Sequence, residues 1–138
     1  MLGVCALDHI VLNCADVERS LAFYQRTLGL PAERVEGWRK GELPFPSVRI
    51  NEGTLIDLVA APRDAGGSRT NLAHFCLVTD QANLDGAIKA LGEAGVGIET
   101  GPAVRSGARG DALSIYFRDP DGNQIELRTY AGVPGVAR

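Results

Sequence analysis

The sequence LDHIVL at residues 7–12 returns in altered form as LAHFCL at residues 72–77. A second pair of matched segments lies further along, LIDL at residues 55–58 and QIEL at residues 124–127. The two halves of the chain therefore carry similar segments in the same order. Such self-similarity is typical of a fold built from two copies of one structural unit.

Each half places one amphipathic helix after its first matched segment. In the first half Asp16 is a suitable cap for a helix whose apolar residues recur every three or four positions, and Gly29 marks its end. In the second half the same spacing runs from Leu84 to Leu91, and Gly95 follows it. We therefore predict one helix in each half.

Short strand-like segments follow each predicted helix. They lie at residues 33–38, 47–51 and 54–60 in the first half and at residues 97–99, 112–118 and 123–129 in the second. The turn sequences Asn51-Glu52-Gly53 and Asp119-Pro120-Asp121-Gly122 close the last hairpin of each half. The predicted order is βαβββ, twice.

These elements predict an α+β fold in which residues 1–138 form a single domain. Module one covers about residues 6–60, module two about residues 72–130, and the polar, Gly-rich residues 61–71 form the linker. Each module has one exposed sheet face. We therefore expect two curved sheets, antiparallel or mixed, that pair around an open barrel cavity completed in a dimer.

The composition excludes several functional classes. The 138 residues carry a net charge of −3, with 45% hydrophobic and 22% charged residues, as in a packed globular domain that binds neither nucleic acid nor membrane. No apolar run reaches the roughly 18–20 residues of a membrane span, and no secretory leader is visible. Cys5, Cys14 and Cys76 lack CxxC spacing, which indicates reduced thiols in a cytoplasmic protein. We expect Cys76 to be a packing residue.

The only two histidines, His9 and His74, both occupy the third position of the repeated first segment. The matched LIDL and QIEL segments add Asp57 and Glu126. Two imidazoles with one or two carboxylates suit Fe, Mn, Ni, Zn or Co as divalent ions, and we predict that they bind one such metal. The alternative is a pair of histidines with ordinary hydrogen bonds.

Other polar residues of the closing strands have a simpler interpretation. Arg118, Gln124 and Arg128 alternate with apolar residues along their strands. An antiparallel sheet commonly exposes one such face, so we expect these three side chains to be solvated.

Three segments resemble the vicinal oxygen chelate superfamily, which includes glyoxalase I, fosfomycin-resistance thiol transferases, extradiol dioxygenases and bleomycin-binding proteins. They are LDHIVLNCADVERSLAFYQRTLGL at 7–30, NLAHFCLV at 71–78 and SIYFRDPDGNQIEL at 114–127. The resemblance covers roughly residues 6–130. It implies paired βαβββ modules, a metal in the open barrel and a homodimer that commonly builds the barrel across two chains.

Carried over residue by residue, the resemblance implies His9, Asp57, His74 and Glu126 as metal ligands. This order looks most like bacterial glyoxalase I, although Asp57 is one methylene shorter than the Glu of that pattern. His9, His74 and Glu126 alone match the three-ligand pattern of the thiol transferases and dioxygenases.

The implied activity is a glyoxalase-I-like lyase or isomerase reaction on a small substrate that chelates the metal through adjacent oxygens. Glu126 or Asp57 would act as the base. Tyr116, Trp38, Phe45 and Arg118 are candidate substrate-binding residues. The alternatives are an extradiol-type dioxygenase, a fosfomycin-resistance-like thiol transferase, and a metal-free protein that binds a small molecule or drug.

Overall fold

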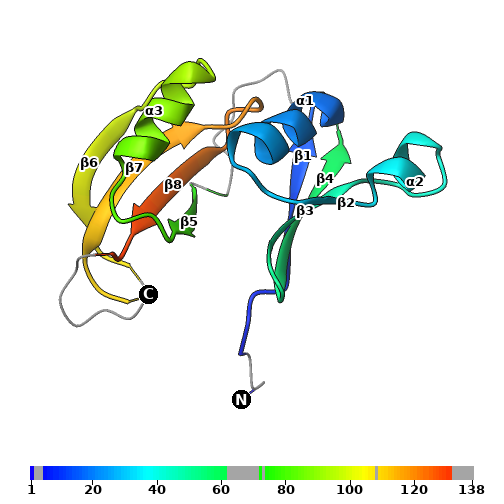
Figure 1. Ribbon diagram of the computed structural model, residues 1–138. Coiled ribbons are helices and arrows are strands. Elements are labelled where there is room, and N and C mark those ends of the chain that lie inside the picture. The colour runs from blue at the N-terminus through cyan, green and yellow to red at the C-terminus, as the bar shows by residue number, and fades with distance from the viewer. Residues whose placement is uncertain (2–4, 62–71, 73, 108, 132–138) are drawn as a thin grey trace. The chain divides into compact units, whose positions relative to one another are not determined.

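A computed structural model describes residues 1, 5–61, 72, 74–107 and 109–131. The chain divides into two compact units, Met1–Ser68 and Arg69–Arg138. The predicted linker, residues 61–71, lies outside the described residues except for Ala61. Figure 1 shows a sheet with its helices in each unit.

The first unit contains one sheet whose strands follow the order β1-β4-β3-β2. The pairing of β1 with β4 is parallel, and the other two pairings are antiparallel. In chain order the elements are β1 (His9–Cys14), α1 (Val17–Ala22), a π-helical turn η1 (Phe23–Thr27), β2 (Ala32–Glu33), α2 (Val35–Arg39), β3 (Ser47–Asn51) and β4 (Thr54–Ala60).

The second unit repeats this topology with the strand order β5-β8-β7-β6, and β5 pairs with β8 in parallel. Its elements are β5 (Phe75–Thr79), α3 (Asp85–Glu93), β6 (Thr100–Arg105), β7 (Ala112–Arg118) and β8 (Gln124–Thr129). The α+β fold class and the two modules predicted from the sequence are confirmed, and the first unit has an additional short helix, α2, between β2 and β3.

One face of each sheet forms an apolar core. In the first unit Leu12 on β1 lies in register with Leu58 on β4, and Val48 on β3 with Ile56 on β4. The second unit buries Ile115, Phe117 and Ile125 in the same way. Because strand side chains alternate, the residues between these positions are all presented on the opposite face.

The helices begin and end as the capping residues predict. Asp16 Oδ1 accepts a hydrogen bond from the backbone N–H of Arg19 at 3.0 Å, which satisfies one of the free donors of α1. Gly29 and Gly95, with φ of 71° and 74°, take the left-handed conformation after the two helical segments. Val17, Leu21 and Tyr24 form the buried stripe of the first helical segment.

The strand prediction for residues 33–38 is wrong. β2 ends at Glu33 because Arg34 adopts a left-handed conformation with φ of 64°, and α2 follows. Two ion pairs support this short helix: Lys40 with Glu36, one turn apart, and Arg39 with Glu18 of α1 at 2.7 and 2.8 Å. The pair between Arg39 and Glu18 is a contact between distant residues, which local sequence patterns do not encode.

The strand predicted at residues 97–99 begins later. β6 covers Thr100–Arg105, and only the backbone N–H of Glu99 bonds to the carbonyl of Tyr116 before it. No helix among the described residues is both long enough and apolar enough to span a membrane.

The turn between β7 and β8 is held by Asp119, whose side chain is almost completely buried. Its Oδ1 accepts from the backbone N–H groups of Asp121 and Asn123 at 3.0 and 2.8 Å, and its Oδ2 from the side-chain amide of Asn123 at 2.7 Å. The turn therefore depends on one carboxylate that satisfies three donors.

Asp119→Ala is expected to lower the free energy of unfolding by about 1–3 kcal/mol, because it leaves buried donors unsatisfied. Urea denaturation followed by circular dichroism measures this loss. The exposed Asp111 provides the control, since Asp111→Ala is expected to change stability by less than about 0.5 kcal/mol. Equal effects of the two substitutions would contradict the assigned role of Asp119.

Candidate functional site

The parallel pair β1 and β4 brings His9 and Asp57 together on the polar face of the first unit. Asp57 on β4 is paired with Val11 on β1. His9 lies two residues before Val11 on β1, so its side chain is on the same face of the sheet. The His9 Nε2 atom is 3.9 Å from Asp57 Oδ2. Asp57 is buried, whereas the His9 side chain is about half exposed.

Asp8 fixes the orientation of the His9 ring. Its Oδ2 is 2.7 Å from His9 Nδ1. This hydrogen bond raises the pKa of His9, desolvation partly opposes it, and the charge of Asp57 adds to the rise. When neutral His9 donates from Nδ1 to Asp8, the lone pair lies on Nε2, and imidazoles that bind metals commonly have such a carboxylate partner.

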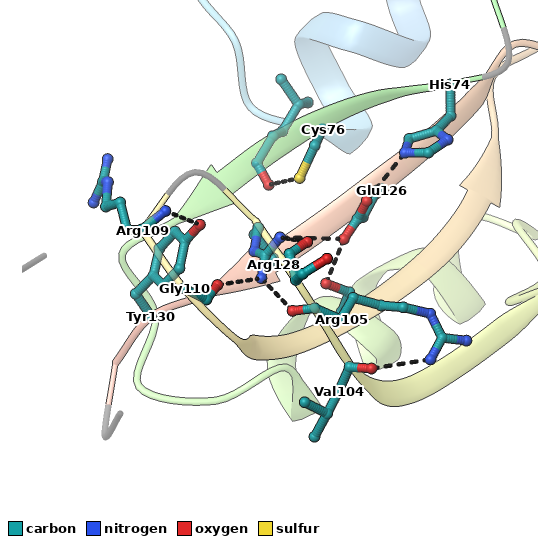
Figure 2. Close-up of polar contacts among 12 residues, drawn as sticks. His74, Cys76, Val104, Arg105, Arg109, Gly110, Glu126, Arg128 and Tyr130 are labelled. Carbon is teal, nitrogen blue, oxygen red and sulfur yellow. Dashed lines mark hydrogen bonds and ion pairs between the residues drawn. The ribbon is translucent and has the colours of Figure 1, made fainter. Parts of the chain in front are cut away.

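The second unit builds the matching pair from β5 and β8. His74 Nε2 is 3.2 Å from Glu126 Oε2, and Figure 2 shows the two side chains pointing toward one another. The Glu126 side chain is 6% exposed and that of His74 is 40% exposed. The Tyr116 ring meets the His74 ring edge to face, with centroids 5.6 Å apart.

Glu126 remains ionised although it is buried. Burial raises the pKa of this carboxyl group. Hydrogen bonds from Ser114 and Tyr116 and the charges of Arg128 and His74 lower the pKa by a larger amount, so the net shift is downward. The Ser114 hydroxyl donates to Glu126 Oε1 at 2.6 Å. Burial, and after it the Glu126 carboxylate, raises the pKa of Tyr116, which stays protonated as a hydrogen-bond donor.

Arg128 is not solvated as the alternation of the strand predicted; its side chain is only 3% exposed. Its guanidinium donates to the carbonyls of Arg105, Ser106 and Gly110 in the loop between β6 and β7, at 2.7, 2.9 and 3.3 Å. Figure 2 shows these hydrogen bonds of the guanidinium. The same group is 3.6 Å from Glu126 Oε1 and 4.8 Å from the centroid of the Tyr130 ring. Arg128 therefore links the loop to the strand that carries Glu126.

Cys76 differs from its predicted role as a packing residue, because it is exposed on the polar face beside Glu126 in the register. The pKa of Cys76 is raised to about 11. Partial burial of the thiol is the main cause, and the nearby charge of Glu126 is the second. The sulfur is consequently protonated at neutral pH and is a poor nucleophile.

The four predicted substrate-binding residues take different places. Tyr116 lies beside His74 and Glu126. Arg118 lies at the end of β7, where it pairs with Glu99 and donates to the Gly122 carbonyl at 2.8 Å. Trp38 lies on α2. Phe45 comes after this helix, and the Arg34 guanidinium carbon is 4.7 Å from the centroid of the Phe45 ring. For all four residues a substrate role stays a prediction.

Sequence reasoning missed three residues that contact the predicted ligands. These are Asp8, which holds His9, and the serines Ser47 and Ser114, which hold Asp57 and Glu126. Alternation along β7 places Ser114 on the same face as Tyr116, so this position was available from the sequence. Its contact with Glu126 depends on register, which the sequence did not supply.

The donor chemistry of each pair fits a divalent ion of the Fe, Mn, Ni, Zn or Co class. Each unit offers a partly exposed imidazole nitrogen and a carboxylate oxygen. Within the described part of the chain, no group of three or more His, Cys, Asp and Glu side chains could hold an ion. The four predicted ligands are therefore present as two pairs, one in each unit.

Gly107→Ala is expected to detach the loop from Arg128, because a β-carbon there would overlap the Arg128 guanidinium and crowd the Tyr130 hydroxyl. We expect a loss of about 1–3 kcal/mol in the free energy of unfolding, measured by urea denaturation. Gly97→Ala is the matched control, since its β-carbon would meet open space. Unchanged stability of Gly107→Ala would show that the loop is not held by this contact.

Comparisons with known proteins place the chain in a family. The model of the Glyoxalase/Bleomycin resistance protein/Dioxygenase superfamily matches residues 6–127. Glyoxalase domain-containing protein RDO1 of Mycosarcoma maydis is 38% identical over 132 residues, which cover 94% of this chain and 70% of that protein. Virulence protein STM3117 of Salmonella typhimurium is 35% identical over 126 residues, which cover 90% of this chain and 83% of that protein.

A solved structure supports the same assignment. An integron cassette protein of V. cholerae is 32% identical, with a TM-score of 0.76 over 95% of this chain and 99% of that chain. The resemblance found in the sequence is thus confirmed by a family model and by a fold. The chain belongs to the Glyoxalase/Bleomycin resistance protein/Dioxygenase superfamily.

Proposed function

We propose that this chain is a metal-dependent enzyme in which His9, Asp57, His74 and Glu126 together bind one divalent ion. The observation that carries the proposal is the repeated pair: in each unit an imidazole Nε2 faces a buried carboxylate oxygen, at 3.9 and 3.2 Å. A single pair would be an ordinary hydrogen-bonded histidine. Two pairs built by the same topology supply the donor number of a complete metal site.

The proposed reaction is a glyoxalase-I-like isomerisation or lyase step on a small substrate. A divalent ion held by these donors would stabilise negative charge on two adjacent substrate oxygens. Glu126 supplies a fixed carboxylate, because Ser114 holds its Oε1 and the pKa of the group is lowered. Asp57 is the second carboxylate, and we assign it as the base that takes a proton from a substrate carbon and returns it to the adjacent carbon.

Substrate contacts are proposed for the residues that surround the second pair. Tyr116 donates its hydroxyl hydrogen to Glu126, so its oxygen can accept a hydrogen bond from a substrate hydroxyl. Trp38, Phe45 and Arg118 complete the proposed set. We also propose that the chain works as a homodimer, in which the two pairs meet either within one chain or between two chains.

Metal content tests the proposal directly. Protein purified anaerobically without chelator or affinity tag is expected to contain about one equivalent of Fe, Mn, Ni, Zn or Co by elemental analysis. His74→Ala and Glu126→Gln are expected to lose this metal and keep the fold. Glu93→Gln, an exposed acid of α3, is the matched control and is expected to retain it. Absence of metal from the wild type, even after reconstitution, would favour a metal-free protein that binds a small molecule.

The role of Asp57 needs its own measurement, because its distance to the paired histidine is the longer of the two. Asp57→Ala is expected to weaken metal binding by about tenfold or more in chelator competition. Unchanged affinity would leave His9, His74 and Glu126 as a three-ligand site. If activity is also unchanged, that outcome would favour the transferase or dioxygenase alternatives, whereas lost activity with the metal retained would make Asp57 a base and not a ligand.

A further inference from the structure

Two serines contact the proposed carboxylate ligands in the same way. The Ser47 hydroxyl donates to Asp57 Oδ1, and the Ser114 hydroxyl donates to Glu126 Oε1, both at 2.6 Å. Both serines are completely buried, with 0% exposure. An O–H donor at this distance from a carboxylate makes a strong, charge-assisted hydrogen bond, so each acid is firmly held at one oxygen.

The held oxygen is never the one that faces histidine. In the first unit Asp57 Oδ1 is held by Ser47, while Oδ2 faces His9 Nε2. In the second unit Glu126 Oε1 is held by Ser114, with Arg128 3.6 Å away, while Oε2 faces His74 Nε2. In each pair the oxygen that faces the imidazole is therefore different from the one that the serine holds, and Tyr116 adds a further hydrogen bond to Glu126.

The two units reach this arrangement through different strand registers. Ser47 lies directly opposite Asp57, whereas Ser114 lies opposite Arg128 and is therefore diagonal to Glu126, whose direct partner is Tyr116. Diagonal neighbours are about 7–8 Å apart, against about 4.5–5.5 Å for direct ones. The longer Glu side chain reaches the diagonal serine, and the shorter Asp side chain meets the direct one. The two units therefore make the same serine–carboxylate hydrogen bond from different strand pairings, and the sequence repeat alone does not explain it.

We propose that Ser47 and Ser114 are positioning residues. Each serine holds one oxygen of its carboxylate and leaves the other oxygen, Asp57 Oδ2 or Glu126 Oε2, to bind the metal as a monodentate ligand. This inference rests on the metal site proposed above. Without the serine, the carboxylate can rotate and offer both oxygens or neither, which changes both the affinity and the coordination of the ion.

The test compares Ser114→Ala and Ser47→Ala with the wild type, using added Co(II) as the probe. We expect the serine-to-alanine variants to bind Co(II) about 10–100-fold more weakly in chelator competition. We also expect their visible Co(II) absorption spectrum to change, since this spectrum reports the ligands and coordination number. Ser114→Thr keeps the hydroxyl and is expected to restore both the affinity and the spectrum. Ser20→Ala, at an equally buried serine of α1, is the matched control.

The outcomes separate positioning from simple packing. Lower melting temperature of the metal-free variants, with unchanged Co(II) affinity and spectrum, would reduce the serines to structural residues and overturn the inference. Wild-type protein that binds no Co(II) would overturn the proposed function and the inference with it. If Ser114→Ala does not melt cooperatively, Ser47→Ala tests the same arrangement in the other unit. Weaker Co(II) binding in Ser20→Ala to the same extent would also contradict the assignment.

Discussion

The parallel pairing of the first and last strands within each unit is the constraint on which the candidate site depends. It places β1 beside β4 and β5 beside β8, although two further strands and at least one helix separate the members of each pair along the chain. The register then puts His9 near Asp57 and His74 near Glu126 on the polar face, while the apolar core fixes which face that is. A slip of one residue would bury the histidines and expose the core.

Much of this arrangement was predictable from the sequence because it depends on local patterns. The helix cap at Asp16, the stop at Gly29 and the turn at Asp119 are each encoded by a few neighbouring residues. The repeated segments identified the two histidine–acid pairs, since matched positions in two similar units lie at matched places in the fold. The prediction of a strand at residues 33–38 was wrong because α2 depends on a contact between Arg39 and Glu18.

The environment of the acids could not be predicted, because it depends on which residues lie opposite them. Alternation places Arg128 on a face that is commonly exposed, but the loop between β6 and β7 covers it. Alternation also predicts the face of Ser114, but not that Glu126 reaches across one pair to bond with it. Cys76 was expected to be a packing residue because cysteine side chains are commonly buried. The structure instead places Cys76 on the exposed face.

The buried Arg128 makes the two copies of the unit unequal. In the first unit the residue two positions beyond the acid is Val59, a hydrocarbon, whereas in the second it is Arg128, a cation beside Glu126. Each unit thus carries a matching histidine–acid pair, and at the position two residues beyond the acid only the second unit has a permanent positive charge. The charge of Arg128 helps to lower the pKa of Glu126 in the second unit, and a hydrocarbon side chain takes the matched position in the first. A repeated fold can in this way assign different tasks to equivalent positions.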